Sequence, residues 1–347
     1  MKLSSLKLFT CAAALVAAGA LSAQAQGNGF NTPGNILISD QYNNRLIEVN
    51  PNNHKIVWSF GNGSSVAGPH SVVGVNDAQR IGPITLVAGT GVPAGAETTC
   101  PNGCADNRVM LVDPSGNIFW QYGKAGVTGS GPNQLNAPVQ NTWLPNTHIL
   151  ITDQGNARII EVTLNKKIVW QYGQTGVTGD GPNQLNNPNS AELLANGNIL
   201  IADENNNRVI EVNRKKQIVW SYGCATCSEL NIVAFASRLP DGTTLMTDGG
   251  NNRIVDVDSG GNVVWTYYTN ARLGSVSSPA PSRAVLLQTG NVLISDQNNM
   301  QVIEIDPSQN IVFQQGTIAV AGNGFDLLNG PYDAKVIGDY TGLTPPF

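Results

Sequence analysis

Apolar residues fall into short runs that recur along the chain, with the same polar loop after every second run. In the clearest copy, the runs are residues 191–194, 198–202, 209–212 and 217–222, and the last contains Trp220. The second run is almost wholly apolar, while the third alternates around Glu211 and is expected nearer to solvent. Runs of four to six residues bounded by Gly and Asn are typical of strands rather than helices. One copy therefore predicts four antiparallel strands.

Two markers show that this unit occurs six times. An aromatic residue near the end of each copy gives Trp58, Trp120, Trp170, Trp220, Trp265 and Phe313. A polar residue before the third strand gives Arg45, Arg108, Arg158, Arg208, Arg253 and Gln301. Both markers recur at intervals of 45 to 63 residues. Six copies of a four-stranded unit predict an all-β fold, a six-bladed β-propeller.

The two ends of the chain are expected to close the ring together. The first copy begins at Gly34 without an inner strand, and residues 330–337 resemble 187–194, which lead into the inner strand of the fourth copy. The C-terminus should therefore complete blade 1, leaving no open sheet edge. The expected blades are 34–61 with 331–341, 69–123, 138–173, 188–223, 231–268 and 281–316, within one domain at 26–347. Blade 2 departs from the pattern: Ala88 is expected in place of the usual Asp, and an insertion follows it.

The N-terminal residues indicate the cellular compartment of the protein. Lys2 and Lys7 precede an apolar run over residues 8–21, and Ala23 and Ala25 form a small-x-small cleavage site. Residues 1–25 thus read as a secretory signal, and the mature chain is expected in the periplasm or outside the cell. No later run is long enough to span a bilayer. The formal net charge of −5, which becomes more negative without the leader, argues against nucleic acid or anionic membranes as partners. We expect a monomer.

Four cysteines remain after the leader, in two closely spaced pairs. They are Cys100, Cys104, Cys224 and Cys227. Three disulfide connectivities are open, and the two pairs together also have a spacing that could hold zinc. Export favours two short-range disulfides that stiffen loops on one face.

The pattern Leu-Ile-x-Asp-x-x-Asn-x-Arg-Val-Ile-Glu-Val resembles the NHL repeat, as do the Gly-Pro-Asn-Gln-Leu-Asn-x-Pro linkers at 131–138 and 181–188. The resemblance covers residues 34–341 and implies a propeller; the family includes binding scaffolds and a few enzymes.

The repeated polar loop has two readings. Its members are Asp40/Asn43/Arg45, Asp153/Asn156/Arg158, Asp203/Asn206/Arg208, Asp248/Asn251/Arg253 and Asp296/Asn299/Gln301. They could form a ring of ligand or Ca²⁺ sites, or each Asp could accept loop amides while the Arg pairs with it. Near-uniform repetition favours the second reading, and the tryptophans are likewise expected to pack between sheets.

A site is more to be expected in the central channel, where the inner strands differ. Their aligned channel positions are Ser71 and Val73, Gln140 and Thr142, Ser190 and Glu192, Phe235 and Ser237, Arg283 and Val285, and Asp333 and Lys335. One residue earlier, at the mouth, are His70, Val139, Asn189, Ser282 and Tyr332. Candidate ligand-binding residues are Asn141, Asn189, Gln140 and Tyr332.

Likeness to other six-bladed propellers implies three kinds of channel chemistry. Similarity to gluconolactonases would imply one Ca²⁺, for which Glu192, Asp333, Asn141 and Asn189 supply oxygens, but Arg283 and Lys335 would neutralise the carboxylates. Zinc chemistry of the amidating-lyase kind needs converging histidines, and His54, His70 and His148 are not expected to converge. A nucleophilic channel histidine, as in arylsulfotransferases, could only be His70. No metal or other cofactor is therefore expected.

Two functions remain. The favoured one is an exported, non-enzymatic scaffold that binds a protein, peptide or glycan through its loops. The alternative is a hydrolase, lyase or transferase, Ca²⁺-dependent or not, with His70, Glu192, Arg283 and Asp333 as candidate catalytic residues. An open channel would favour catalysis, and a channel filled by Arg–carboxylate pairs would favour scaffolding.

Overall fold

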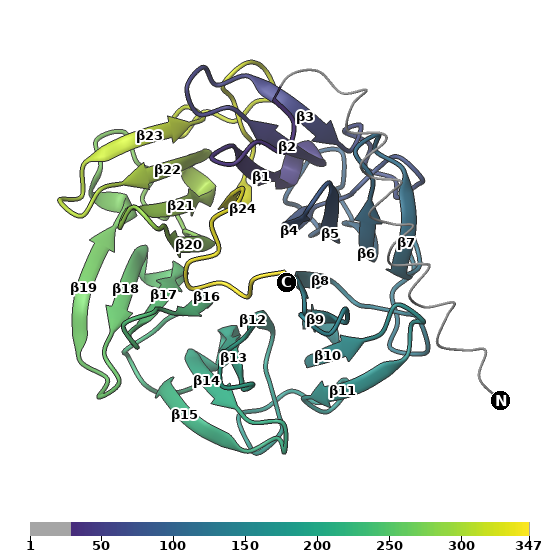
Figure 1. Ribbon diagram of the computed structural model, residues 1–347, viewed down its shortest axis with the longest axis vertical. Helices are drawn as coiled ribbons and strands as arrows, with labels where there is room; N and C mark the ends of the chain where they lie inside the picture. Colours follow the sequence, from purple (N-terminus) through teal and green to yellow (C-terminus); the bar gives the residue numbers. More distant parts are fainter. Residues whose placement is uncertain (1–28, 347) are drawn as a thin grey trace.

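Six four-stranded antiparallel sheets surround a central axis in the computed structural model, which describes residues 29–346 (Figure 1). The predicted fold is confirmed. Blade 1 contains β24 (Pro331–Val336), β1 (Ile36–Asp40), β2 (Arg45–Val49) and β3 (Ile56–Phe60). Blade 2 contains β4 (Val75–Ile81), β5 (Ile84–Val92), β6 (Cys104–Val112) and β7 (Ile118–Gly123). Blade 3 contains β8 (Pro138–Trp143), β9 (Ile149–Asp153), β10 (Arg158–Val162) and β11 (Ile168–Tyr172).

The other three blades follow the same order from the axis outward. Blade 4 contains β12 (Pro188–Leu193), β13 (Ile199–Asp203), β14 (Arg208–Val212) and β15 (Ile218–Gly223). Blade 5 contains β16 (Val233–Arg238), β17 (Thr244–Asp248), β18 (Arg253–Val257) and β19 (Val263–Tyr268). Blade 6 contains β20 (Arg283–Leu286), β21 (Val292–Asp296), β22 (Gln301–Ile305) and β23 (Ile311–Gln315). The 3₁₀ turns are η1 (Gln41–Asn43), η2 (Gln154–Asn156), η3 (Glu204–Asn206), η4 (Gly249–Asn251), η5 (Thr269–Ala271) and η6 (Gln297–Asn299).

The core lies between neighbouring blades rather than at the axis. Six apolar clusters each join residues of two adjacent sheets, as where Ile160 and Ile151 of blade 3 meet Leu86 and Val109 of blade 2. Indole N–H groups add to this packing, since the Trp58 Nε1 donates to the Pro114 carbonyl of the next blade at 2.8 Å. The tryptophans are therefore packing residues, as predicted.

The C-terminal strand closes the ring. β24 pairs antiparallel with β1, with Ala334 opposite Ile38, so segments almost 300 residues apart share one sheet (Figure 1). The predicted closure of blade 1 by the C-terminus is confirmed.

The repeated polar loop has the predicted structural role. In blade 4 the Asp203 Oδ1 accepts the Asn186 backbone N–H at 2.7 Å. Its Oδ2 accepts the Asn206 amide at 2.7 Å and the Arg208 Nε at 2.8 Å. Each acceptor thus ties the end of the second strand to the preceding linker and to the third strand, and Asp40, Asp153 and Asp248 make the same set of bonds.

Blade 6 lacks the cation of this motif. Gln301 donates to the Asp296 Oδ2 at 2.8 Å where other blades place Arg, and burial raises the pKa of Asp296 to about 6. A folded-state pKa above the ordinary value means that this group contributes stability below about pH 4, which is lost as pH rises through about 6.

Gln301→Arg should lower the pKa of Asp296, so the variant gains about 1–3 kcal/mol of unfolding free energy over wild type between pH 4 and 8 in urea unfolding. Arg253→Gln in blade 5 is the matched control and should lose stability over the same range; parallel curves for all three proteins would contradict the argument.

Two expectations for blade 2 are wrong. Its inner strand is β4, so Asp77 and Gln79 occupy the channel positions, while Ser71 and Val73 precede the strand. Gly89, not Ala88, faces Arg108 at the usual Asp position, and a Cβ there would lie 2.5 Å from the Asp106 carboxyl carbon. Asp106 pairs with Arg108 at 2.5 Å from the neighbouring strand instead. In blade 2 the carboxylate of the motif therefore comes from the third strand, β6, and not from the second strand, β5. Aligning the repeats by sequence alone then gives the wrong strand register.

The third strands are also more buried than expected. All five residues of β14 are buried, because the Glu211 carboxylate pairs with Arg238 of blade 5 at 3.2 Å rather than facing solvent.

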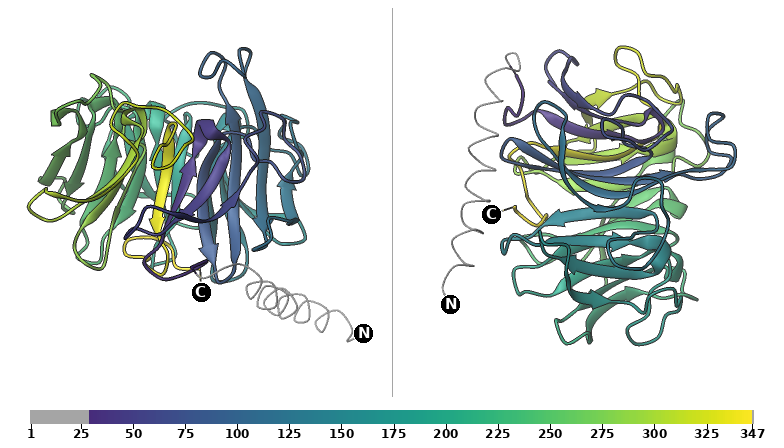
Figure 2. Two further views of the ribbon diagram at one scale, coloured as in Figure 1. Left: turned by 90° about the horizontal axis from the view of Figure 1, so that it is seen from above. Right: turned by 90° about the vertical axis from the view of Figure 1, so that its right-hand side faces the viewer.

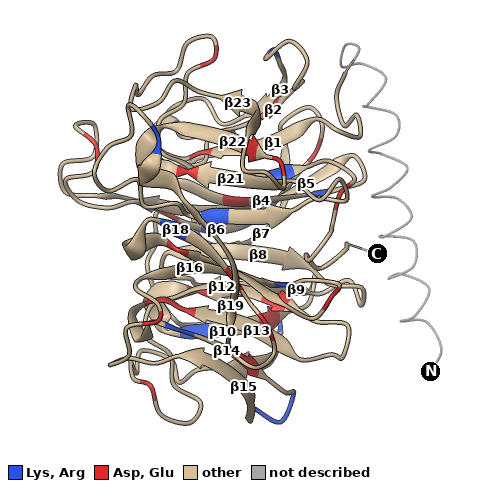
Figure 3. Ribbon diagram, turned by 90° about the vertical axis from the view of Figure 1, so that its left-hand side faces the viewer, with Lys and Arg blue, Asp and Glu red and all other residues tan. Residues whose placement is uncertain are grey.

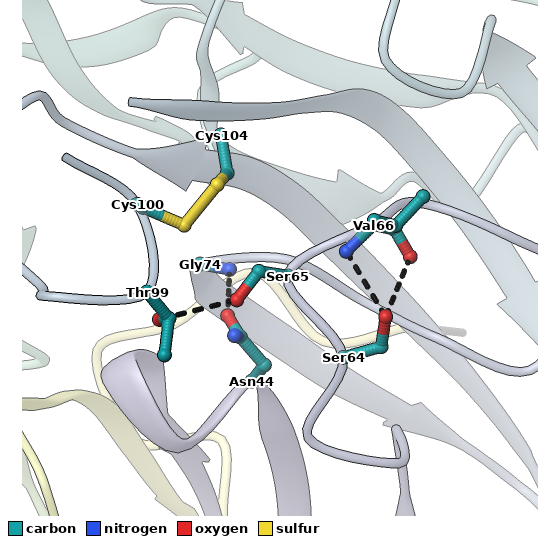
Figure 4. The surroundings of a disulfide bond; sticks show 8 residues. All are labelled: Asn44, Ser64, Ser65, Val66, Gly74, Thr99, Cys100 and Cys104. Carbon is teal, nitrogen blue, oxygen red and sulfur yellow. Dashed lines mark hydrogen bonds between the residues drawn. A yellow bond between two sulfur atoms is a disulfide. The ribbon is translucent and has the colours of Figure 1, made fainter. Parts of the chain in front are cut away.

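The two cysteine pairs form short-range disulfides, Cys100–Cys104 and Cys224–Cys227, as predicted. The first closes the long β5–β6 hairpin, where Thr99 beside it bonds Ser65 (Figure 4).

The disc has two distinct faces. We define the loop face as the side with the 3₁₀ turns, the linkers between blades and the β5–β6 hairpin, and the tail face as the side where residues 337–346 lie (Figure 2). Residues 29–346 include no helix long and apolar enough to cross a membrane. The expected signal segment 1–25 lies outside the described residues.

Candidate functional site: a pocket at the channel mouth

The centre of the channel holds four paired charges. Arg283 bonds Asp77 and Asp333 at 2.7 Å each. Lys335 bonds the same carboxylates at 2.6 and 2.7 Å. Burial favours the neutral carboxyl forms and keeps the pKa of Asp77 raised; at Asp333, the opposing attraction of Arg283 and Lys335 prevails and lowers the pKa. These residues come from blades 1, 2 and 6, so the channel is bridged rather than open.

The tail closes the other side of the channel. The Glu192 Oε2 accepts the Thr344 backbone N–H at 2.9 Å, and its Oε1 accepts the Gln140 amide at 2.6 Å. The Thr344 carbonyl accepts the Gln79 amide at 3.1 Å. Figure 3 shows acidic and basic residues on strands of several blades, so charge is not confined to the channel. Figure 1 shows the tail crossing the axis.

The residues considered for metal binding are bonded to other side chains or to the tail and do not converge on one point. Asn141 binds the Asp77 carboxylate at 2.9 Å, and Asn189 binds Glu204 and Tyr332 at 2.7 and 2.8 Å. Glu192 and Asp333 have the partners given above. Within residues 29–346, no three His, Cys, Asp or Glu side chains are grouped so as to hold a metal ion.

The three histidines lie apart, as expected, but His70 is not at the channel. It is exposed in the linker before β4, because the inner strand begins six residues later than the alignment placed it. His54 is on a turn of blade 1, stacked on Phe313, and His148 pairs with Glu161 at 2.6 Å.

A ring of side chains encircles the channel mouth on the loop face. Each member directly follows the motif position at the end of a second strand: Gln41, Thr90, Gln154, Glu204, Gly249 and Gln297. Several bond across blades, with Gln297 donating to Gln41 at 2.7 Å and Gln154 to Glu204 at 3.1 Å. Gly249 alone contributes no side chain. The ring is therefore interrupted at blade 5.

A pocket of about 150 Å³ lies at this interruption. Glu204, Asn189, Gln297 and Tyr332 supply its polar wall, and blade 5 and the linker to blade 6 supply an apolar one. The Glu204 Oε2 accepts three amides, from Asn189 at 2.7 Å and from Asn187 and Gln154 at 3.1 Å. Burial raises the pKa of Glu204 to about 7 even against these bonds. A carboxyl group with a raised pKa in a cleft is typical of a functional site.

Of the pocket residues, Asn189 and Tyr332 are predicted from the sequence, whereas Glu204, Gln297 and Gly249 are not. The signal was available, because the residue after the repeated Asp differs between copies that share the Asp and the Asn.

A closed six-bladed propeller with a pocket at one mouth of its channel defines a broad class of proteins. Residues 105–323 match the family described as outer membrane protein assembly factor BamB, and the chain belongs to that family. No curated protein sequence matches the chain.

Solved structures share the fold at low sequence identity. A Bacteroides caccae protein of unknown function superposes with a TM-score of 0.58 at 16% identity, covering 82% of this chain and 93% of that one. Inactive virginiamycin B lyase from Staphylococcus aureus with quinupristin gives 0.52 at 13%, covering 83% and 86%. A streptogramin B lyase gives 0.53 at 12%, covering 84% and 80%.

Proposed function

We propose that the protein is an exported scaffold, NHL-like in its repeats, that binds a protein, peptide or glycan on its loop face. The observation that carries this proposal is the state of the channel, where Arg283 and Lys335 neutralise Asp77 and Asp333. Pairing of this kind leaves neither Asp77 nor Asp333 free to act as an acid or base on a substrate. The loop face keeps a cavity and the less regular parts of the repeat.

Two further features support the proposal. Disulfides are typical of exported proteins, and both disulfides stiffen loops of the face proposed to bind. Family membership points the same way, since a BamB-like propeller is expected to act by binding.

The alternative, a hydrolase, lyase or transferase in the channel, has less support. Glu192, Arg283 and Asp333 are committed to other side chains, and His70 lies outside the channel. The lyases that share the fold do so at 12–13% identity, which transfers no residue.

The test uses two substitutions of equal exposure. Ile232 at the pocket and Val169 on the outer strand β11 are each 46% exposed. Immobilised wild type, Ile232→Arg and Val169→Arg would be incubated with the native exported fraction, and retained proteins and glycans identified by mass spectrometry. We expect the Ile232 variant to lose, by roughly tenfold, a partner that the Val169 variant keeps, because a hot-spot side chain buried at an interface contributes 2 kcal/mol or more. Equal retention by both variants would contradict binding at the loop face.

A further inference from the structure

The hydrogen bonds around the mouth pocket are strongly one-sided. Asn189 uses its amide donors on Glu204 and the Tyr332 hydroxyl, and the Gln297 amide donates to Gln41. The Ser282 hydroxyl donates to the Tyr332 carbonyl at 2.7 Å. The side-chain donors of Asn189, Ser282 and Tyr332 are therefore already used, and the Ser278 hydroxyl and the second N–H of Gln297 remain.

Four backbone N–H groups at the pocket are used as well. The Ile232 N–H donates to the Asn207 side chain, and the Gly249 N–H donates to the Ile232 carbonyl. The Ala280 N–H donates to the Asn252 side chain, and the Ser282 N–H donates to the Ser295 carbonyl. A sugar hydroxyl or an amide, which seeks both donors and acceptors, would find few donors here.

Acceptors remain free in the same pocket. The Glu204 Oε1 has no hydrogen-bond partner among the described residues, whereas its Oε2 is held by three amides. The Gln297 Oε1 also has no partner among them, since only its amide nitrogen is bonded. A carboxylate fixed through one oxygen presents the other in a set orientation, which lowers the ordering cost of binding.

Charge and shape narrow the ligand further. Glu204 is the one ionisable group at the pocket besides the Tyr332 phenol, and the nearby Arg283 is spent on Asp77 and Asp333. The lining also has an apolar part, with Ile232, Ala234, Ala280 and Pro281. The ligand that fits such a pocket has a positively charged group that only donates hydrogen bonds, carried on an apolar stem. A lysine side chain has both properties.

We propose that the mouth pocket binds a lysine side chain of a peptide partner, with the ammonium on the Glu204 Oε1 and the stem against the apolar wall. This inference rests on the proposed scaffold function and specifies its ligand. Gly249 is what leaves room for the side chain, since a Cβ there would lie 3.1 and 3.2 Å from the Pro281 and Ile232 carbonyls.

The test follows the backbone amides of Gly249 and Gly250 by NMR at pH 8 while acetyl-Gly-Lys-Gly-amide is added to the full protein. A saturable shift is expected, absent with the Nε-acetyl-lysine peptide. Glu204→Gln should weaken binding roughly tenfold, as expected for loss of a charge-assisted hydrogen bond. Glu229→Gln, which removes an exposed carboxylate on the same face, should leave binding unchanged.

Two variants test the cavity without altering charge. Gly249→Ala narrows the pocket and should weaken binding, while Gly324→Ala on another linker meets only Leu327 at 3.8 Å and should not. Binding should also rise about tenfold from pH 6 to pH 8 as Glu204 ionises, because burial keeps the facing Tyr332 phenol neutral by raising its pKa.

Equal shifts from the lysine and acetyl-lysine peptides, or unchanged binding in Glu204→Gln, would overturn the lysine assignment. The scaffold function is judged separately, by partner retention in the Ile232 and Val169 variants. If Ile232→Arg loses its partner and the protein does not respond to the lysine peptide, lysine binding is rejected while partner binding on the loop face is retained.

Discussion

Ending the chain after Gly330 should lower the melting temperature by more than about 10 °C or prevent folding, because the loss rivals the ~5–15 kcal/mol that stabilises a typical protein. The truncation removes β24, which pairs with β1 along its length and buries Ala334 between blades 1 and 6. It also removes Asp333 and Lys335 from the channel and leaves Arg283 with Asp77 alone. The exposed edge of β1 would then be free to aggregate.

A second truncation distinguishes the stability contributed by β24 from that contributed by the tail. Ending the chain after Gly338 keeps β24 and removes Thr344 from Glu192, so its cost should be clearly smaller. Circular dichroism melting of both proteins measures the difference. Adding a peptide of residues 330–347 to the shorter protein should restore part of its stability. A melting curve unchanged by the truncation after Gly330 would refute closure by the C-terminus.

Periodicity predicted the fold because a propeller repeats one local unit. Strand alternation, turn residues and the Asp–Asn–Arg loop depend on neighbours within about 35 residues, so they can be read from one copy. The channel depends instead on the register of six separate inner strands. In blade 2 the apolar segment around Val73 resembled a strand, while the true strand carries Asn76, Asp77 and Gln79.

The pocket was harder to predict for a related reason. Its carboxylate, Glu204, follows the Asp of a motif that is structural in most blades, so the variable positions between the repeated Asp and Asn were not recognised as a site. The pocket exists because Gly249 has no side chain, and a glycine can be recognised as a gap only once the other members of the ring are known. Which donors are already used depends on contacts between blades, and these have no linear signature.

Arg283→Met should destabilise the protein by about 3–5 kcal/mol, the cost of removing one partner from a buried ion pair. Arg283 is buried, stacks 4.1 Å from the centre of the Phe235 ring and is shared by Asp77 and Asp333. Without it, two buried carboxylates have only Lys335 for charge compensation. Urea unfolding of the variant measures the loss. Arg45→Met should cost less, because the buried Asp40 carboxylate keeps its hydrogen bonds from the Asn43 amide and the Asn329 backbone N–H.

The pH dependence of this loss identifies its cause. Unpaired buried carboxyl groups have folded-state pKa values above their unfolded ones, so the stability they permit is present at low pH and lost as pH rises. The deficit of Arg283→Met should therefore be larger at pH 8 than at pH 5. Adding Asp77→Asn should recover part of it at pH 8, since one unpaired charge is then removed. A deficit that is constant with pH, and not reduced by the second substitution, would mean that Arg283 acts by packing on Phe235 and not as the counter-ion that fills the channel.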